Sequence, residues 1–383
     1  MSKRQSSRRM VPLSRPSIGD DEKQAVLDVL ESGWLTHGPK NLEFEEAFAD
    51  YHGVAHAVSM NSCASVLQAS VEGFGITGEI IVPSFTWVAS ANAIVKGGAT
   101  PVFADIDEAT RNVSVMSIER LVTARTEAIM PVHFAGQVAD MTGVMRIAEK
   151  HGLAVIEDSA ETLGGMHEGK LAGTWGVGCY SFFPTKNITT GEGGMLLTQD
   201  AVLARRVRSL IGHGIDKSTY EREAAQKSWF RGASTVGYNF RLSNFQAAIG
   251  LVQLRKLDRL NARRRELARL YQTLLSSVSE IVLPIERPEN HHVYQMYTVT
   301  VRDAGHRDEL VTALCAEGVG ASVHFVPTVH QMVPYSTGYR MDDLSVTLDV
   351  AARIVTLPMY PDMTNDDVGY ACDAIRRFFH STA

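Results

Sequence analysis

The sequence predicts an α/β protein: a large first domain with a mostly parallel sheet, followed by a smaller α+β domain. Up to about residue 243, short continuous apolar runs alternate with helical patterns, which is typical of a parallel sheet covered by helices on both faces. Beyond that point the pattern changes to one long helix and then to isolated strands. The 383 residues and 45% hydrophobic content suffice for one large core or two modest ones.

The elements of the large domain follow one another in a regular order. A helix is predicted over residues 20–32, where Val26 and Leu30 share a face and Gly33 follows, and another over residues 42–51. Strands are then predicted at residues 80–83, 101–106, 128–133, 153–158 and 180–183, with helices at residues 62–73, 91–96 and 141–151. Because ligands of open parallel sheets bind at the carboxyl ends of the strands, a site is expected there.

The second part of the chain begins with a long helix from Ser243, whose leucines continue through Leu274. After it we predict strands at residues 297–301 and 322–326 and a final helix at residues 366–379. A domain boundary is placed inside the long helix, near residue 260. The predicted organisation is a basic flexible tail (1–12), a large α/β domain (13–260) and a small α+β domain (261–383), with the N-terminal segment packing on the small domain.

The composition excludes several classes of protein. A net charge of −6 argues against a broad nucleic-acid surface, and no run of about 18 apolar residues is present that could span a membrane. The basic N-terminus lacks the apolar segment of a secretory signal. The four cysteines lie far apart, which favours reduced thiols in a cytoplasm over disulfides or a zinc site: Cys63, Cys179, Cys315 and Cys372. We therefore expect a cytoplasmic protein without a metal.

The most informative pair is Asp158 and Lys186. Asp158 ends an apolar strand, and Lys186 follows the next predicted strand by three residues, on a turn that continues into residues 189–194 (TTGEGG). Burial lowers the pKa of a lysine and makes its amine a nucleophile that can form a Schiff base with an aldehyde cofactor. A carboxylate nearby can keep the pyridine nitrogen of that cofactor protonated. Taken alone, a strand-end Asp is also a common helix cap and a lone Lys is usually solvated.

The neighbouring motifs favour the functional interpretation. Trp87 follows a strand end and could stack on a cofactor ring, although core packing is the alternative. Residues 61–65 (NSCAS) open a helix, whose first N–H groups can bind a phosphate. Ser181 offers a hydroxyl close to the lysine turn, and residues 237–241 (GYNFR) contribute an amide and a guanidinium. Their joint presence in this order indicates a cofactor site.

These residues resemble those of the DegT-like sugar aminotransferases, which use pyridoxal 5′-phosphate (PLP) and have the fold-type-I aminotransferase architecture. The resemblance covers nearly the whole chain, from about residue 11 to residue 379. The matching stretches are residues 32–39 (SGWLTHGP), 82–87 (VPSFTW), 155–161 (VIEDSAE), 181–186 (SFFPTK) with 189–194 (TTGEGG), 237–241 (GYNFR) and 357–361 (LPMYP). The resemblance implies a large domain with a mostly parallel seven-stranded sheet.

The resemblance also implies residue roles. Lys186 is expected to carry the cofactor as a Schiff base, Asp158 to contact the pyridine nitrogen and Trp87 to stack on the ring. A homodimer is expected, because family members complete each site with a residue from the partner subunit. The phosphate is expected to be held by Ser181, by the helix start at Cys63 and Ala64, and by Asn239 from the partner subunit.

Two further positions are implied by the resemblance, and three positions depart from the usual family residues. Arg241 and His324 resemble family positions that touch the substrate. Many members have Gly-Thr where this chain has Cys63 and Ala64, so a side-chain hydroxyl to the phosphate is lost and only backbone amides remain. Where many members have Gln beside the phenolic oxygen of the cofactor, this chain has Glu161, and a carboxylate there could act only if it is protonated or paired.

The reaction implied is transamination of a nucleotide-diphosphate keto-sugar with L-glutamate as amino donor. Residues 189–194 resemble members that aminate carbon 4, so a 4-keto-6-deoxy sugar is expected. Alternatives are a 3-keto sugar, a keto-inositol, an aminohydroxybenzoate product, or a PLP-binding regulator without turnover. A PLP-dependent sugar dehydratase is disfavoured, because those members have histidine where this chain has Lys186.

Overall fold

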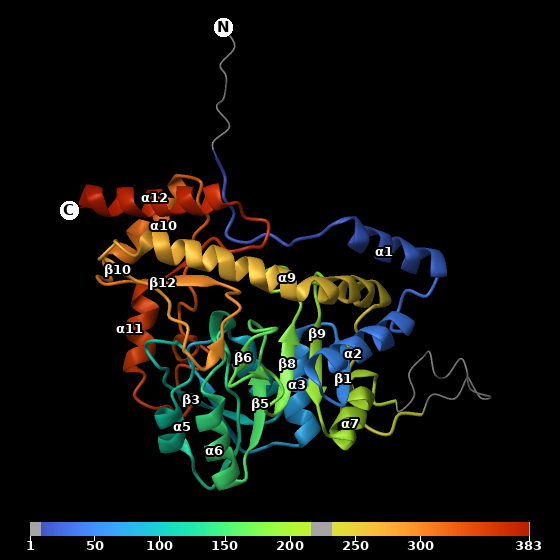
Figure 1. The fold of residues 1–383 in the computed structure, drawn as a ribbon. Helices are drawn as coiled ribbons and strands as arrows, with labels where there is room; N and C mark the ends of the chain where they lie inside the picture. Colours follow the sequence, from blue (N-terminus) through green and yellow to red (C-terminus); the bar gives the residue numbers. More distant parts are fainter. Residues whose placement is uncertain (1–8, 216–231, 383) are drawn as a thin grey trace.

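The computed structural model describes residues 9–215 and 232–382, and its largest feature is a seven-stranded sheet in the order β1-β9-β8-β5-β4-β2-β3 (Figure 1). All neighbouring strands are parallel except the two pairs that involve β9, so the predicted mostly parallel sheet is confirmed. The strands are β1 (His56–Met60), β2 (Glu79–Pro83), β3 (Thr100–Ala104), β4 (Thr126–Ile129), β5 (Ala154–Asp158), β8 (Val177–Ser181) and β9 (Gly194–Thr198).

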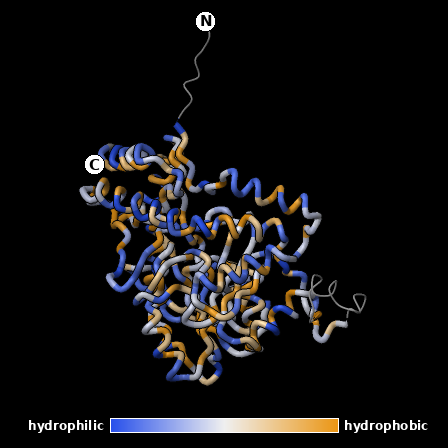
Figure 2. The backbone as a smooth tube through the Cα atoms, turned by 45° about the vertical axis from the view of Figure 1, so that its right-hand side comes forward, coloured by the Kyte–Doolittle hydropathy of each residue, from blue (hydrophilic) through white to orange (hydrophobic). Residues whose placement is uncertain are grey.

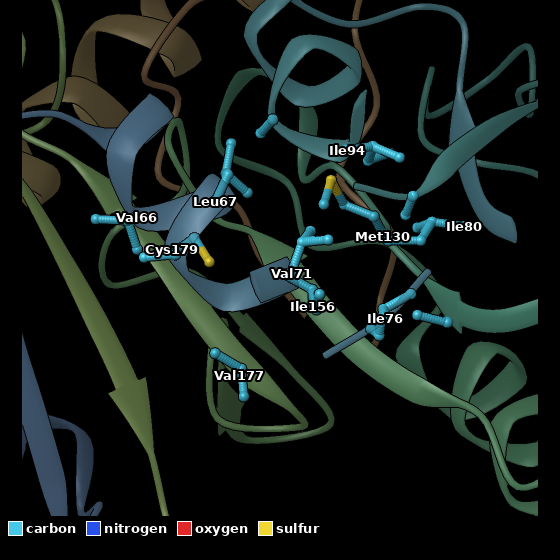
Figure 3. Close-up of a cluster of buried hydrophobic side chains, with 14 of the residues drawn as sticks. Val66, Leu67, Val71, Ile76, Ile80, Ile94, Met130, Ile156, Val177 and Cys179 are labelled. Atoms are coloured by element: carbon cyan, nitrogen blue, oxygen red, sulfur yellow. The ribbon is translucent and has the colours of Figure 1, made fainter. Parts of the chain in front are cut away.

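Helices cover both faces of this sheet. On β2, Ile80 and Val82 join one buried cluster with residues of α3 and α4, whereas Ile81 joins a second cluster with residues of α5 and α6. Figure 3 shows the first cluster, in which Val71 and Ile94 lie against the strands. A strand buried on both faces explains the continuous apolar runs in the sequence. The helices are α3 (Cys63–Phe74), α4 (Ala89–Lys96), α5 (Val115–Leu121), α6 (Met141–His151) and α7 (Ala201–Ile211).

A single long helix, α9 (Asn244–Leu275), links the two parts of the molecule (Figure 1). Ser243 caps it, since its hydroxyl accepts the amide of Gln246. Along α9, buried side chains up to Leu260 join a cluster with α2 (Pro39–His52), and those from Leu267 onward join a cluster of the C-terminal part. Helix α1 (Asp20–Ser32) packs along the first half of α9. The buried side chains of α9 therefore pass from one cluster to the other between Leu260 and Leu267, close to the predicted domain boundary. The division into domains stays a prediction.

The C-terminal part combines a small sheet with three helices. The sheet has the order β10-β12-β13 and is antiparallel throughout. Its elements are β10 (Ile281–Val282), β12 (Tyr297–Val301), α10 (His306–Ala316), α11 (Ser345–Arg353), β13 (Ile354–Leu357) and α12 (Asn365–Thr382). A third small sheet joins β11 (Asn290–His291), β6 (Met166–His167) and β7 (Lys170–Leu171), and two short 3-10 helices are η1 (Phe134–Gly136) and η2 (Val329–Gln331).

Several predictions differ from the structure in detail. The flexible tail predicted for residues 1–12 is too long: residues 1–8 lie outside the described residues, but Val11 is fully buried and forms a bridge with Val319. The strand predicted at residues 322–326 is wrong, because only Ser322 pairs, in an isolated bridge with Thr356. Strands β1 and β9 were not predicted, and β4 is shorter than the apolar run that predicts it.

The surface helices carry the mixed pattern expected of elements with one buried face. In Figure 2, α1 and α12 alternate between hydrophilic and hydrophobic colours along their length. Among the described helices, none is both long enough and apolar enough to cross a membrane.

Candidate active site

Asp158 is the last residue of β5 and lies at the carboxyl edge of the sheet, almost fully buried. Its Oδ2 accepts a hydrogen bond from the hydroxyl of Ser90 at 2.8 Å, and its Oδ1 accepts one from the amide of Ala160 at 3.2 Å. Burial raises the pKa of the Asp158 carboxyl, and these two hydrogen bonds oppose that rise. No described helix begins at Asp158, so the helix-cap alternative is wrong.

Lys186 lies on the turn after β8, where its amide donates to the carbonyl of Phe183 at 2.9 Å. Its side chain is only 16% exposed, and its Nζ donates to Oε1 of Glu161 at 3.2 Å. The charge of Lys186 lowers the pKa of Asp158 against the larger effect of burial, so the two predicted residues are electrostatic neighbours. The alternative of an ordinary solvated lysine is therefore wrong.

The glycine-rich run after Lys186 folds the chain back tightly. The hydroxyl of Thr189 and the amide of Thr190 both donate to the carbonyl of Phe182, at 2.8 and 3.0 Å. A Cβ on Gly194 would lie 2.8 Å from the amide nitrogen of Cys63. Only glycine allows β9 to begin this close to the start of α3, which brings the lysine turn and the helix start together.

The start of α3 has the features of an anion site. The hydroxyl of Ser62 caps the helix by accepting the amide of Ser65 at 3.1 Å. Cys63 and Ala64 are the first two helical residues, whose N–H groups have no partner within a helix. Burial raises the pKa of the Cys63 thiol well above its usual range; the charge of Asp158 raises it further and that of Lys186 lowers it. The helix start therefore lies in the same site as the predicted pair.

Trp87 and Ser181 lie at the edges of this region. The side chain of Trp87 is 64% exposed, which rules out the core-packing alternative and leaves an indole free to cover a ring. Ser181 is the last residue of β8, half-buried, and pairs with Gly194 across the strands.

The segment that carries Asn239 and Arg241 passes beside the start of α3. The carbonyl of Phe240 accepts the amide of Asn61 at 2.7 Å, and Nε of Arg241 donates to Oδ1 of Asn239 at 2.9 Å. Asn239 is exposed. The structure thus places both residues near the predicted phosphate site of their own chain, and the contribution of Asn239 to a partner subunit stays a prediction.

His324 reaches the site from the C-terminal part. It lines a small cavity of about 80 Å³ together with Lys186 and Glu161, and its Nδ1 lies 2.7 Å from the hydroxyl of Thr356. Burial lowers the pKa of His324, so its imidazole is neutral at neutral pH. The same cavity contains Gln295, whose Oε1 has no hydrogen-bond partner among the described residues.

Sequence reasoning missed two side chains of this site. Ser90 supplies the hydrogen bond to Asp158, and Gln295 adds an amide beside Lys186, since its Nε2 donates to the carbonyl of Thr185 at 2.8 Å. Ser90 lies three residues after Trp87, near the start of a predicted helix, which is the only local signal that could have indicated it. Nothing in the pattern around Gln295 distinguishes it from other polar residues.

The assembled residues fit PLP. A largely buried amine, a buried carboxylate and an exposed indole lie at one sheet edge, and beside them lies a helix start whose first amides have no partner within the helix. The unpartnered amide oxygen of Gln295 shows that this cavity still has hydrogen-bonding capacity. The donor set thus provides a separate group for each part of the cofactor: aldehyde, pyridine nitrogen, ring face and phosphate.

Comparisons with known proteins agree with this site. The model of the DegT/DnrJ/EryC1/StrS aminotransferase family matches residues 16–376. The chain is 40% identical over 380 residues to the spore coat polysaccharide biosynthesis protein SpsC of Bacillus subtilis, which covers 97% of this chain and 98% of that protein.

Solved structures are similar over nearly the full length. The structure of DesI in the presence of its TDP-sugar product has a TM-score of 0.87 and 31% identity, covering 97% of this chain and 95% of that chain. The PLP form of the putative sugar aminotransferase Spr1654 from Streptococcus pneumoniae has a TM-score of 0.90 and 26% identity, covering 98% of this chain and 100% of that chain.

Proposed function

We propose a reaction for this chain from one premise: it belongs to the DegT/DnrJ/EryC1/StrS aminotransferase family. As a member it is a PLP-dependent aminotransferase that acts on a sugar. The finer proposal is that it transfers the amino group of L-glutamate to carbon 4 of a nucleotide-linked 4-keto-6-deoxy sugar. The TDP-sugar product in the DesI structure supports a nucleotide-linked substrate. A cytoplasmic location is proposed with it, since nucleotide sugars and reduced cysteines share that compartment.

One observation carries the proposal: Lys186, Glu161 and Asp158 lie together at the carboxyl edge of the sheet, with Lys186 held by Glu161 and within electrostatic reach of Asp158. When bound, PLP supplies an aldehyde for an amine and a ring that accepts the electron pair of a substrate carbon. Nζ of Lys186 takes a proton from the substrate carbon that carries the nitrogen and returns it to the carbon on the other side of that nitrogen, acting first as general base and then as general acid.

The other side chains bind and orient. The carboxylate of Asp158 holds the proton of the ring nitrogen, and the surrounding protein keeps water from weakening that ion pair. The indole of Trp87 covers the ring face. The amides at Cys63 and Ala64, together with the hydroxyl of Ser181, bind the phosphate at the positive end of α3.

We also propose a symmetric homodimer. A groove of about 530 Å³ lies between α1 and the turn that follows Lys186. It is largely apolar, and Ile18 and Leu27 on its rim are 46% and 49% exposed in the single chain. A second copy of this chain is the occupant we propose, because the groove adjoins the site that Asn239 of a partner would complete.

Two experiments test the proposal. A panel of nucleotide keto-sugars is offered with L-glutamate, and the aminated carbon is identified by NMR. Amination of carbon 3 or of a keto-inositol would replace the carbon-4 assignment.

The second experiment locates the cofactor. Borohydride should fix PLP on Lys186, as shown by peptide mapping, and label on another lysine would refute the site.

Shared sites are tested by mixing chains. Lys186→Ala and Asn239→Ala chains, each impaired alone, should recover part of the activity as hybrid dimers, because one of the two composite sites is then whole. No recovery, with heterodimers shown to form, would refute the shared site.

A further inference from the structure

Both oxygens of the Glu161 carboxylate are engaged, each by a different donor. Oε1 lies 3.2 Å from Nζ of Lys186, and the two side chains are 9% and 16% exposed. Oε2 accepts a hydrogen bond from the backbone amide of Ala135 at 3.0 Å. The turn Phe134–Gly136 that presents this amide is itself held, because the amide of Phe134 donates to Oδ1 of Asn112 at 2.8 Å. Glu161 is therefore fixed from both sides.

Each donor places an N–H group on one oxygen of the carboxylate. A hydrogen bond from a backbone amide stabilises the charged form of a carboxyl group, and an ammonium at 3.2 Å does so more strongly. A proton on Oε2 would face the N–H of Ala135, which also needs an acceptor. The amide of Ala135 carries no net charge, so Lys186 can offset the charge of this anion only while it carries its proton.

The other titratable groups around the pair are Asp158, His324 and Cys63, and burial raises the pKa of the Cys63 thiol well above its usual range, so that it is neutral. Burial raises the pKa of Asp158, and the charge of Glu161 raises it further. Burial lowers the pKa of His324, which is therefore neutral at neutral pH and cannot balance a carboxylate. Among the described residues that line the cavity of His324, Lys186 is the only cation. The charge of Glu161 is thus balanced by Lys186 and by no other side chain of that cavity.

We propose that Glu161 is the counter-ion of the free Lys186 side chain: whenever Lys186 is not joined to the cofactor, Glu161 holds its Nζ in place as an ammonium. This rests on the proposed role of Lys186 as the cofactor lysine. Glu161 acts through Lys186 and is a positioning residue. Many family members have Gln at this position. Glu161 replaces that neutral amide with a carboxylate, which stabilises a positive charge on Lys186.

The proton balance of this role is simple. When Nζ takes a proton from a substrate carbon it becomes –NH₃⁺, and the Glu161 carboxylate offsets that charge until the proton is passed on. To rejoin an aldehyde, –NH₃⁺ must first release one proton to solvent. The remaining –NH₂ then forms the C=N bond, while the aldehyde oxygen leaves as water with the two nitrogen-bound hydrogens. Capture of the aldehyde therefore depends on pH, and Glu161 shifts that dependence.

The test measures cofactor capture by the full-length chain from which cofactor has been removed. PLP is added over a series of pH values, its capture is followed by absorbance, and borohydride with peptide mapping confirms attachment to Lys186. Glu161→Gln keeps the shape and removes the charge. We expect the pH of half-maximal capture rate to fall by about one unit, so that capture is about tenfold faster at a pH below both midpoints.

Two variants serve as comparisons. Glu161→Asp keeps the charge and should keep the midpoint closer to that of wild type than Glu161→Gln does. Glu79→Gln is a matched control, because Glu79 is a buried carboxylate whose Oε2 lies 2.6 Å from Nη2 of Arg340, outside the cavity of Lys186. It should leave the midpoint unchanged. Thermal unfolding of each variant checks that the fold is intact.

The outcomes separate the two proposals. If wild type captures no PLP on Lys186, the proposed function fails and this inference fails with it. If wild type captures PLP normally but Glu161→Gln has the same midpoint, or a higher one, the counter-ion role alone is overturned. A higher midpoint would show that Glu161 withdraws the proton from Lys186 and does not hold it there.

Discussion

Glu157 and Asp158 are adjacent on β5, both carboxylates are buried, and they have opposite surroundings. Glu157 is fully buried, and its two oxygens accept four hydrogen bonds. The donors are the amides of residues 173, 175 and 176 and a ring nitrogen of His133, at 2.7 to 3.1 Å. From the described residues Asp158 accepts only two, from Ser90 and Ala160, and burial raises its pKa.

The difference teaches how to separate a structural from a functional buried carboxylate. A carboxylate has about four acceptor positions, and Glu157 fills them with donors of the protein itself. Its role is to hold the loop that follows β7. Asp158 keeps acceptor capacity for a donor that the chain does not supply, which fits a pyridinium N–H. Alternation along the strand directs the two side chains to opposite faces.

We expect Asp158→Ala to have the largest effect on activity. Because the proton on the ring nitrogen loses its partner, kcat should fall by about 10³-fold or more, and PLP should dissociate more readily, while the fold is retained. Steady-state kinetics and absorbance of retained cofactor measure both quantities. Activity close to that of wild type would overturn the assignment of Asp158 to the pyridine nitrogen.

Glu157→Gln should have the opposite effects: it should lower the stability of the fold and leave turnover nearly unchanged. The amide presents two N–H groups to a place where four donors converge, so at least one buried donor loses its acceptor; we expect the free energy of unfolding to fall by about 2–4 kcal/mol. Turnover per folded molecule should stay within a few-fold of wild type. Denaturant unfolding and kcat at a temperature well below the transition check this. A large loss of turnover without loss of stability would contradict the comparison.

Ser90→Ala tests the side chain whose hydroxyl donates to Asp158. A hydrogen bond to a charged group contributes about 1.5–3 kcal/mol, so cofactor affinity or kcat should fall by about ten- to a hundredfold. Thr86→Val is a control, since its hydroxyl contacts Ser90 at 3.0 Å but is not a partner of Asp158. If both variants have equal effects, the hydrogen bond to Asp158 is not the reason for the loss.

The smallest expected effect is on how the free energy of unfolding of the cofactor-free chain depends on pH. Burial raises the pKa of Asp158 in the cofactor-free fold, so the folded state holds this proton more tightly than the unfolded state does. As pH rises above about 4, the ionisation of Asp158 therefore lowers the free energy of unfolding. Asp158→Asn should therefore stabilise the cofactor-free chain at pH 7 by an amount on the order of 1 kcal/mol. The gain should vanish as pH approaches 4, as measured by denaturant unfolding. A gain that is independent of pH would contradict this cause.

Local patterns in the sequence predict most of the framework. The predicted helix over residues 20–32 is α1, and the strand over residues 297–301 is β12, with identical bounds. The strand predicted at residues 322–326 is wrong, because only Ser322 pairs; His324 instead lines the cavity beside Lys186, and Phe325 packs in a buried cluster. Strand β9 was missed because the glycines before it read as a continuing turn.

The sequence by itself determined the α/β class, the position of Asp158 at a strand end and of Lys186 on a turn, and the family these residues resemble. Periodicity and turn chemistry are local, so they can be read from neighbouring residues. Only the tertiary structure decided what each charge faces: Ser90 is 68 residues from Asp158, and Glu161 is 25 residues from Lys186. Burial and pairing of a charge depend on segments that folding brings together, and those contacts define the chemistry of the site.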